Sequence, residues 1–163
     1  MKIYWINEFK AGKLGMMTRP RGYDWLEDDI LKLKRMGVGV LISLLEREEI
    51  AELGLMREGE VCEREGITFH TYPMVDRGVP SSVRTFLSLV KKVNCNLRQG
   101  DQVVVHCRMG TGRSALLAAA LLIRQGMGTH EAFDVLGKSR RLSVPDTEEQ
   151  IAWIAERVEL LRA

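Results

Sequence analysis

Residues 103–123 read VVVHCRMGTGRSALLAAALLI. The β-branched start of this stretch predicts a buried strand, and its alanine- and leucine-rich end predicts a buried helix. The loop between them begins at Cys107, contains Gly110 and Gly112, and ends at Arg113. A loop that opens a helix presents unpaired backbone N–H groups and the positive end of the helix dipole, which together form an anion site. We therefore expect a strand–loop–helix unit that binds an anion.

Cys107 and Arg113 supply the chemical groups of this unit. The planar guanidinium of Arg113 can hold two oxygens of a phosphate or sulfate. A thiol beside a helix N-terminus and an arginine ionises readily, so Cys107 should be a thiolate at neutral pH. The glycines let the backbone curl so that successive N–H groups face inward. The predicted phosphate-binding residues are Arg108, Met109, Gly110, Thr111, Gly112 and Arg113.

The order of these residues resembles the signature of the cysteine-dependent protein tyrosine phosphatases. His106 precedes Cys107, five residues separate Cys107 from Arg113, and Ser114 follows the arginine. The resemblance covers nearly the whole chain and is to small single-domain, dual-specificity-type members, especially compact bacterial or archaeal ones. A Walker A loop does not match, because Cys107 and Arg113 stand where that motif needs glycine and lysine. The alternative is a buried structural cysteine in a glycine-rich turn.

Length and composition are those of an ordinary globular domain. The chain has 163 residues, of which 45% are hydrophobic and 28% charged, and its net charge is +2. It shows no dense basic stripe for nucleic acid, and its longest apolar run is far shorter than the ~20 residues that span a bilayer. The three cysteines have no paired spacing and lie in no His/Cys cluster, which indicates neither a disulfide framework nor a zinc site. We expect residues 1–163 to form a single catalytic domain in a reducing, cytoplasmic environment, with no metal, cofactor, nucleic-acid partner or membrane partner; the sequence does not determine the oligomeric state, and a monomer is the favoured expectation.

The apolar pattern predicts strands that alternate with helices. The predicted strands cover residues 3–6, 14–18, 38–44, 67–72 and 103–105. The first predicted helix begins with a capping-box sequence at Asp24 and Glu27, and residues 46–65 are predicted to form two short helices. Further helices are predicted to start at Ser81 or Ser82 and at residue 113, and two more are predicted to be capped by Thr129, with the helix running through Arg140, and by Thr147. The charged segment 46–65 is expected to be a solvated face. This alternation indicates an α/β fold, with a central, mostly parallel sheet flanked by helices on both faces, as in the phosphotyrosine phosphatases.

Asp76 is the candidate general acid. Transfer of a phosphoryl group to a thiolate expels an alkoxide or phenoxide, which needs a proton donor nearby. Asp76 lies in the loop 74–80, at the carboxyl end of a predicted strand, where sites of α/β sheets assemble. The resemblance implies the same role, and Met74-Val75 before the aspartate is similar to the dual-specificity branch. The alternative is an Asx-turn without a catalytic role.

Ser114 and Gln150 are candidates for the breakdown of a phospho-cysteine. The Ser114 hydroxyl can hydrogen-bond the thiolate, and the resemblance implies that it helps the thiolate leave; the alternative is a small residue at a helix start. Gln150 ends the capping-box sequence Thr147-x-x-Gln150. The segment 144–150 also resembles the one whose glutamine orients the attacking water in some family members. The sequence alone leaves both interpretations of Gln150 open.

Four other residues have lesser expected roles. His106 ends a buried strand and is expected to hydrogen-bond locally, without transferring protons. Arg77 is either a substrate contact or a solvated side chain. Cys62 and Cys95 are predicted to fill the core, and the alternative is that one of them forms a disulfide with an oxidised Cys107.

The resemblance implies a two-step hydrolysis of phosphate monoesters. Cys107 attacks phosphorus while the loop and Arg113 hold the oxygens, and Asp76 protonates the leaving group; water then hydrolyses the phospho-cysteine. No metal is needed, because the loop and Arg113 supply the positive charge. A phosphorylated protein or peptide is the favoured substrate, because Arg108 is the only loop cation besides Arg113. The alternatives are inositol phosphates, phosphoinositides or nucleotides and, from another class, a catalytically inactive phosphate-binding module. A sulfurtransferase fits the Asp76 loop and the Arg113-Ser114 ending poorly.

Overall fold

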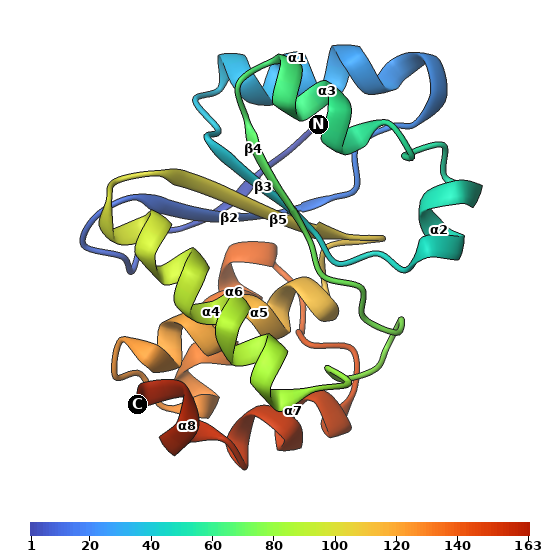
Figure 1. The fold of residues 1–163 in the computed structure, drawn as a ribbon. Coiled ribbons are helices and arrows are strands. Elements are labelled where there is room, and N and C mark those ends of the chain that lie inside the picture. Colours follow the sequence, from blue (N-terminus) through green and yellow to red (C-terminus); the bar gives the residue numbers. More distant parts are fainter.

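A five-stranded sheet forms the middle layer of the molecule (Figure 1). The computed structural model describes residues 1–163. The strands are β1 (Tyr4–Ile6), β2 (Lys13–Thr18), β3 (Val40–Ser43), β4 (Thr68–Thr71) and β5 (Gln102–Cys107). The helices are α1 (Leu26–Arg35), α2 (Arg47–Glu52), α3 (Glu58–Arg64), α4 (Val83–Arg98), α5 (Arg113–Arg124), α6 (Thr129–Arg140), α7 (Glu148–Ala155) and α8 (Val158–Arg162).

The strand order β1-β2-β5-β3-β4 places β5 at the centre of the sheet. β1 is antiparallel to β2, and all other neighbouring strands are parallel, so the predicted mostly parallel sheet is confirmed. In the register, Val104 of β5 lies between Gly15 of β2 and Leu41 of β3. Because the carboxyl ends of parallel strands share one edge, the loops after β4 and β5 open at the same edge of the sheet.

Helices cover both faces of the sheet, as the sequence predicts (Figure 1). α1 and α3 pack on one face around a core cluster of 13 buried residues, and α4 to α8 lie on the other around a cluster of 30. β5 contributes to both clusters, since Val103 and Val105 face one and Val104 faces the other. Every residue of α5 from Arg113 to Ile123 is buried. None of the helices combines the length and apolar composition needed to cross a membrane.

Two predicted helix caps are wrong, although the helices are present. Tyr23–Trp25 form a 3₁₀ turn that runs directly into α1, so Trp25 is the N-cap and the predicted capping box at Asp24 does not form. α6 begins at Thr129, but the extended residue before it, Gly128, is the N-cap, and no side chain caps this helix. Asp24 thus lies in the 3₁₀ turn before α1, and Thr129 is the first residue of α6.

The last predicted helix is two helices, α7 and α8. Its capping box is present, because Thr147 accepts from the Gln150 N–H and the Gln150 side chain accepts in return. α7 ends before Arg157. The backbone N–H of Arg157 donates to the carbonyl of Ile154, and the Arg157 guanidinium donates to the carbonyl of Trp153. The arginine side chain thus occupies the acceptor that the next turn of helix would use.

The charged segment 46–65 forms α2 and α3, but its expected exposure is wrong at two positions. Glu49 is 8% exposed and Glu58 is 2% exposed. Each has a buried basic partner from the β5–α5 unit, Arg113 for Glu49 and His106 for Glu58. A buried carboxylate is stable only with such a partner. The two pairs connect the segment 46–65 to the β5–α5 unit, so two of its glutamates lie in the interior beneath the loop.

Candidate active site

The loops after β4 and β5 and the start of α7 surround a pocket of about 210 Å3 at the carboxyl edge of the sheet. The residues that line it are Asp76, Arg77, Cys107, Arg108, Met109, Thr111, Gly112 and Asp146. Two predicted catalytic groups, the thiol of Cys107 and the carboxylate of Asp76, therefore face one pocket together with most of the predicted phosphate-binding loop.

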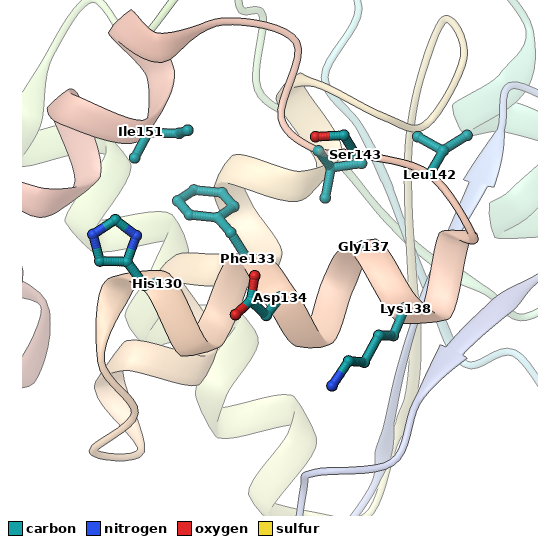
Figure 2. Close-up of a pocket in the computed structure, with 9 residues that line it drawn as sticks. His130, Phe133, Asp134, Gly137, Lys138, Leu142, Ser143 and Ile151 are labelled. Atoms are coloured by element: carbon teal, nitrogen blue, oxygen red, sulfur yellow. The ribbon is translucent and has the colours of Figure 1, made fainter.

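A larger hollow of about 430 Å3 lies between α6 and the segment that leads into α7 (Figure 2). Phe133 and Ile151 contribute apolar surface to it, and Lys138 extends from α6 beside it. Neither Cys107 nor Arg113 lines this hollow. The thiol of Cys107 lines only the smaller pocket, and the Arg113 guanidinium lies beside it, next to Asp76.

The sulfur of Cys107 accepts two hydrogen bonds at the base of the loop. The backbone N–H of Gly110 donates to Sγ at 3.3 Å, and the hydroxyl of Ser114 donates to it at 3.2 Å. Two donors aimed at one sulfur stabilise negative charge on it. Gly110 has a φ of 75°, and a Cβ at this position would collide with the carbonyl of Met17. The close approach of β2 to the loop thus requires glycine here.

Neighbouring elements hold the loop carbonyls on its outer side. The Arg108 carbonyl accepts from the Arg19 N–H at 3.3 Å. The Met109 carbonyl accepts from the Thr18 hydroxyl and from the Arg140 guanidinium, each at 3.2 Å. With these carbonyls turned away, the loop N–H groups are free to face the pocket. Sequence reasoning missed Thr18 and Arg140, because both lie far from the loop in the chain and belong to no motif.

Arg113 is buried and fixed by two neighbouring elements. Its Nη1 donates to Glu49 Oε2 at 2.7 Å and to the Met74 carbonyl at 2.9 Å, and its Nη2 donates to Glu49 Oε1 at 2.9 Å. Its Nε is buried and has no hydrogen-bond partner in the protein. An unsatisfied buried donor costs about 1–3 kcal/mol, and a phosphate oxygen is an acceptor that would satisfy it.

Glu49 orients Arg113, and little in the sequence indicates this role. Burial alone would raise the pKa of Glu49, but the hydrogen bonds and charge of Arg113 outweigh burial and hold this pKa at about 2. Glu49 also accepts from Arg108 Nε at 3.4 Å, and Glu52 accepts from Arg108 Nη2 at 3.3 Å. The Arg108 side chain is therefore directed to α2, while its backbone belongs to the loop.

Asp76 lies in a tight turn at the rim of the pocket. The Gly78 N–H donates to the Val75 carbonyl at 2.9 Å, and Arg77 between them has a left-handed φ of 60°. The Asp76 carboxylate is 54% exposed and places Oδ1 3.2 Å from Arg113 Nη2. It accepts no backbone hydrogen bond, so the turn does not use Asp76 as an Asx-turn residue. The carboxylate therefore lies at the rim of the pocket with Arg113 as its charged partner.

Gln150 is fully buried and does not line the pocket. Its Oε1 accepts from the backbone N–H groups of Asp146 at 3.0 Å and Thr147 at 3.2 Å. Its Nε2 donates to the Gly78 carbonyl at 2.9 Å. The side chain therefore joins the start of α7 to the turn that contains Asp76.

His106 makes the expected local contact and a second, unexpected one. Its Nδ1 lies 3.2 Å from the Cys107 carbonyl, and its Nε2 lies 2.6 Å from Glu58 Oε1. The His106–Glu58 pair is buried between β5 and α3. The sequence shows no pattern that would pair His106 with a residue from the charged segment.

The three cysteines are free and lie in different environments. Cys62 is in the smaller core cluster, whereas Cys107 belongs to the larger cluster on the opposite face of the sheet, so the two are not placed to form a disulfide. Burial and the nearby charge of Glu58 raise the pKa of the Cys62 thiol to about 12. Cys95 is exposed, so its predicted place in the core is wrong.

Known proteins are similar to this chain in sequence and in fold. The human protein tyrosine phosphatase type IVA 3 is 38% identical over 105 residues, which cover 58% of this chain and 60% of that protein. The crystal structure of kinase associated phosphatase, with its catalytic-site cysteine substituted by serine, has a TM-score of 0.88 and 21% identity, covering 100% of this chain and 97% of that one. Tk-PTP in the active form has a TM-score of 0.77 and 23% identity, covering 96% of each chain.

A family model described as the dual specificity phosphatase catalytic domain matches residues 32–158. The chain belongs to this family. Its members are cysteine-dependent phosphatases that act on phosphorylated substrates. The chain spans about 60% of the length of the human relative that it matches.

Proposed function

We propose that the protein hydrolyses phosphate monoesters of phosphorylated protein side chains through a phospho-cysteine intermediate. The observation that supports this most directly is the sulfur of Cys107, which accepts from Gly110 and Ser114 inside a loop bordered by Arg113. A thiolate with this support is a nucleophile, and the loop N–H groups together with Arg113 Nε supply donors for phosphate oxygens.

The first step transfers the phosphoryl group to sulfur. Cys107 Sγ forms a bond to phosphorus as the bond from phosphorus to the ester oxygen breaks, and Asp76 gives its proton to that oxygen. A phosphate dianion held by Arg113 competes with Asp76 for the guanidinium, which releases the Asp76 side chain toward the ester oxygen. In the second step water attacks phosphorus, Asp76 takes the water proton, and the sulfur leaves as a thiolate that Ser114 stabilises.

The charges at the rim favour a substrate with a single phosphate. Arg108, the one loop cation besides Arg113, is paired with Glu49 and Glu52. Asp146 adds a carboxylate to the pocket wall. A second phosphate on an inositol or a nucleotide would meet these three carboxylates and one cation without a carboxylate partner, Arg77, whereas a phosphorylated peptide side chain presents only one dianion.

Hydrolysis of p-nitrophenyl phosphate in the presence of a chelator tests the reaction class. We expect activity that vanadate blocks, and we expect Cys107→Ser to lower kcat by more than about 1,000-fold because serine is a far weaker nucleophile at neutral pH. The variant should still bind phosphate, since the loop and Arg113 are intact. Activity of Cys107→Ser near the wild-type rate would remove Cys107 from the mechanism, and no activity in a folded, reduced wild type would indicate a phosphate-binding module.

Asp76→Asn tests the proton donor. Phenoxide is a poorer leaving group than p-nitrophenoxide and depends more on protonation, so the loss in kcat/KM should be larger for phenyl phosphate. For that substrate we expect a loss of about 100-fold or more. Equal losses on the two esters would assign Asp76 a role in binding instead of acid catalysis.

We also propose that residues 1–163 form one catalytic domain that works as a monomer in a reducing compartment such as the cytoplasm. Two core clusters on one continuous sheet support the single domain. Three free cysteines, one of them the nucleophile, support a reducing environment. The net charge of +2 gives no basis for nucleic-acid binding.

A further inference from the structure

The turn that contains Asp76 is held to the rest of the protein at its two ends. At its start, the Met74 N–H donates to the Leu44 carbonyl at 3.1 Å, and the Met74 carbonyl accepts from Arg113 Nη1 at 2.9 Å. At its end, the Gly78 carbonyl accepts from Gln150 Nε2 at 2.9 Å. Between the ends, the turn has its internal hydrogen bond from Gly78 to Val75 and the ion pair of Asp76 Oδ1 with Arg113 Nη2 at 3.2 Å. A phosphate bound to Arg113 competes with this ion pair, so with substrate bound the position of Asp76 depends on how firmly the two ends of the turn are held.

Gln150 is built as an anchor and not as a ligand for water. Its Oε1, the atom that would accept a hydrogen bond from an attacking water, already accepts from the N–H groups of Asp146 and Thr147. The side chain is 0% exposed and is absent from the lining of the pocket. Its remaining polar atom, Nε2, is directed at the Gly78 carbonyl, two residues beyond Asp76.

We propose that Gln150 is a positioning residue for the general acid: its amide fixes the Gly78 carbonyl and thereby holds Asp76 over the leaving-group oxygen. This inference rests on the proposed function, in which Asp76 is the proton donor. A displacement of about 1 Å in a catalytic group is enough to slow a reaction strongly, so loss of this anchor weakens protonation without removing the acid. The Gln150 amide oxygen accepts from the start of α7, and its amide nitrogen donates to the turn that contains Asp76. One side chain therefore connects the capping box to this turn.

Two substitutions separate the anchor from the cap. Gln150→Glu retains an oxygen that accepts from Asp146 and Thr147, since glutamate also completes a capping box, but as a carboxylate it cannot donate to Gly78. Thr147→Ala removes the oxygen that caps the Gln150 N–H and leaves the donor to Gly78 in place. If thermal unfolding shows that the buried carboxylate prevents folding, Gln150→Met replaces Gln150→Glu; methionine is similar in size and uncharged but loses the capping oxygen together with the donor, so its effect is compared with that of Thr147→Ala, which weakens the cap alone.

The readout is kcat/KM for phenyl and p-nitrophenyl phosphate, with stopped-flow detection of nitrophenoxide. We expect Gln150→Glu to lower kcat/KM for phenyl phosphate by at least about tenfold, with a smaller loss for p-nitrophenyl phosphate. Thr147→Ala should change both esters by the same factor. If Gln150→Glu keeps the wild-type kcat/KM for both esters while a nitrophenoxide burst shows that the phospho-cysteine accumulates, Gln150 acts in the second step alone, as expected if it orients water, and the proposal is overturned.

Losses in Gln150→Glu that are equal for the two esters, or that match those of Thr147→Ala, would also overturn it. Asp76→Asn, measured in parallel, separates this failure from a failure of the proposed function. If Asp76→Asn discriminates between the esters and Gln150→Glu does not, only the role of Gln150 is refuted. If Asp76→Asn does not discriminate, Asp76 is not the acid and both proposals fall.

Discussion

The buried Arg113–Glu49 pair shows how a single carboxylate prepares the site. Two of the guanidinium nitrogens donate to Glu49, so the fork is held in one orientation while Nε is left for another acceptor. A guanidinium in a fixed orientation needs no reorganisation when negative charge develops on a phosphate. Positioning by Glu49 is the reason that Arg113 can be buried, charged and still available to substrate.

Glu49→Gln should destabilise the protein and weaken the pH dependence of its free energy of unfolding. At neutral pH, removal of one partner of a buried ion pair costs about 3 kcal/mol, which denaturant unfolding measures. The pKa of Glu49 is about 2 in the folded protein and 4.5 ordinarily, so its contribution is complete above pH 4.5 and is lost as the pH falls toward 2. The wild type should therefore lose more stability than the variant between pH 4.5 and 2.

Glu48→Gln is the matched control for this prediction. Glu48 lies beside Glu49 in α2, is exposed and has no ion-pair partner. Its substitution should leave both the free energy of unfolding at neutral pH and the acid dependence nearly unchanged. Equal acid dependence of the wild type and Glu49→Gln would show that the ion pair contributes no stability.

At the scale of elements, local patterns predicted most of the fold. The β5–α5 unit, the parallel sheet and the paired short helices α2 and α3 follow from apolar periodicity and from glycine, and all are present. The caps predicted at Asp24 and Thr129 were wrong, because a residue that can cap a helix can also lie one position before or after the N-cap. Capping choices depend on tertiary contacts that a short window of sequence does not contain.

The residues of the candidate site were also predicted only in part. Cys107, Arg113 and Asp76 could be proposed from their spacing and from the strands that precede them, and the structure brings them together around one pocket or at its edge. Glu49, Glu58 and Arg140 could not be proposed from the sequence, because each of them acts through a partner that is far away in the chain. On a helical surface an exposed glutamate and a buried one look alike in sequence until the opposing cation is known.

At the scale of the whole molecule, the sheet separates a reactive thiol from an inert one. Cys107 lies at the carboxyl edge with its sulfur in the pocket, while Cys62 is enclosed between the sheet and the layer of α1 and α3. Burial, together with the charge of Glu58, raises the pKa of Cys62 to about 12, so almost none of it is thiolate at neutral pH. Access to Cys62 therefore requires the smaller core to open.

Alkylation with iodoacetamide at pH 7.5, followed by peptide mass spectrometry, tests this separation. Cys107 and the exposed Cys95 should react in the native protein, and vanadate should protect Cys107 alone. Cys62 should react only at the rate of core opening, and this rate should rise with denaturant in parallel with global unfolding, because opening of a core element is linked to the stability of the fold. Alkylation of Cys62 as fast as Cys95 without denaturant would show that α1 and α3 open independently of the catalytic half of the molecule.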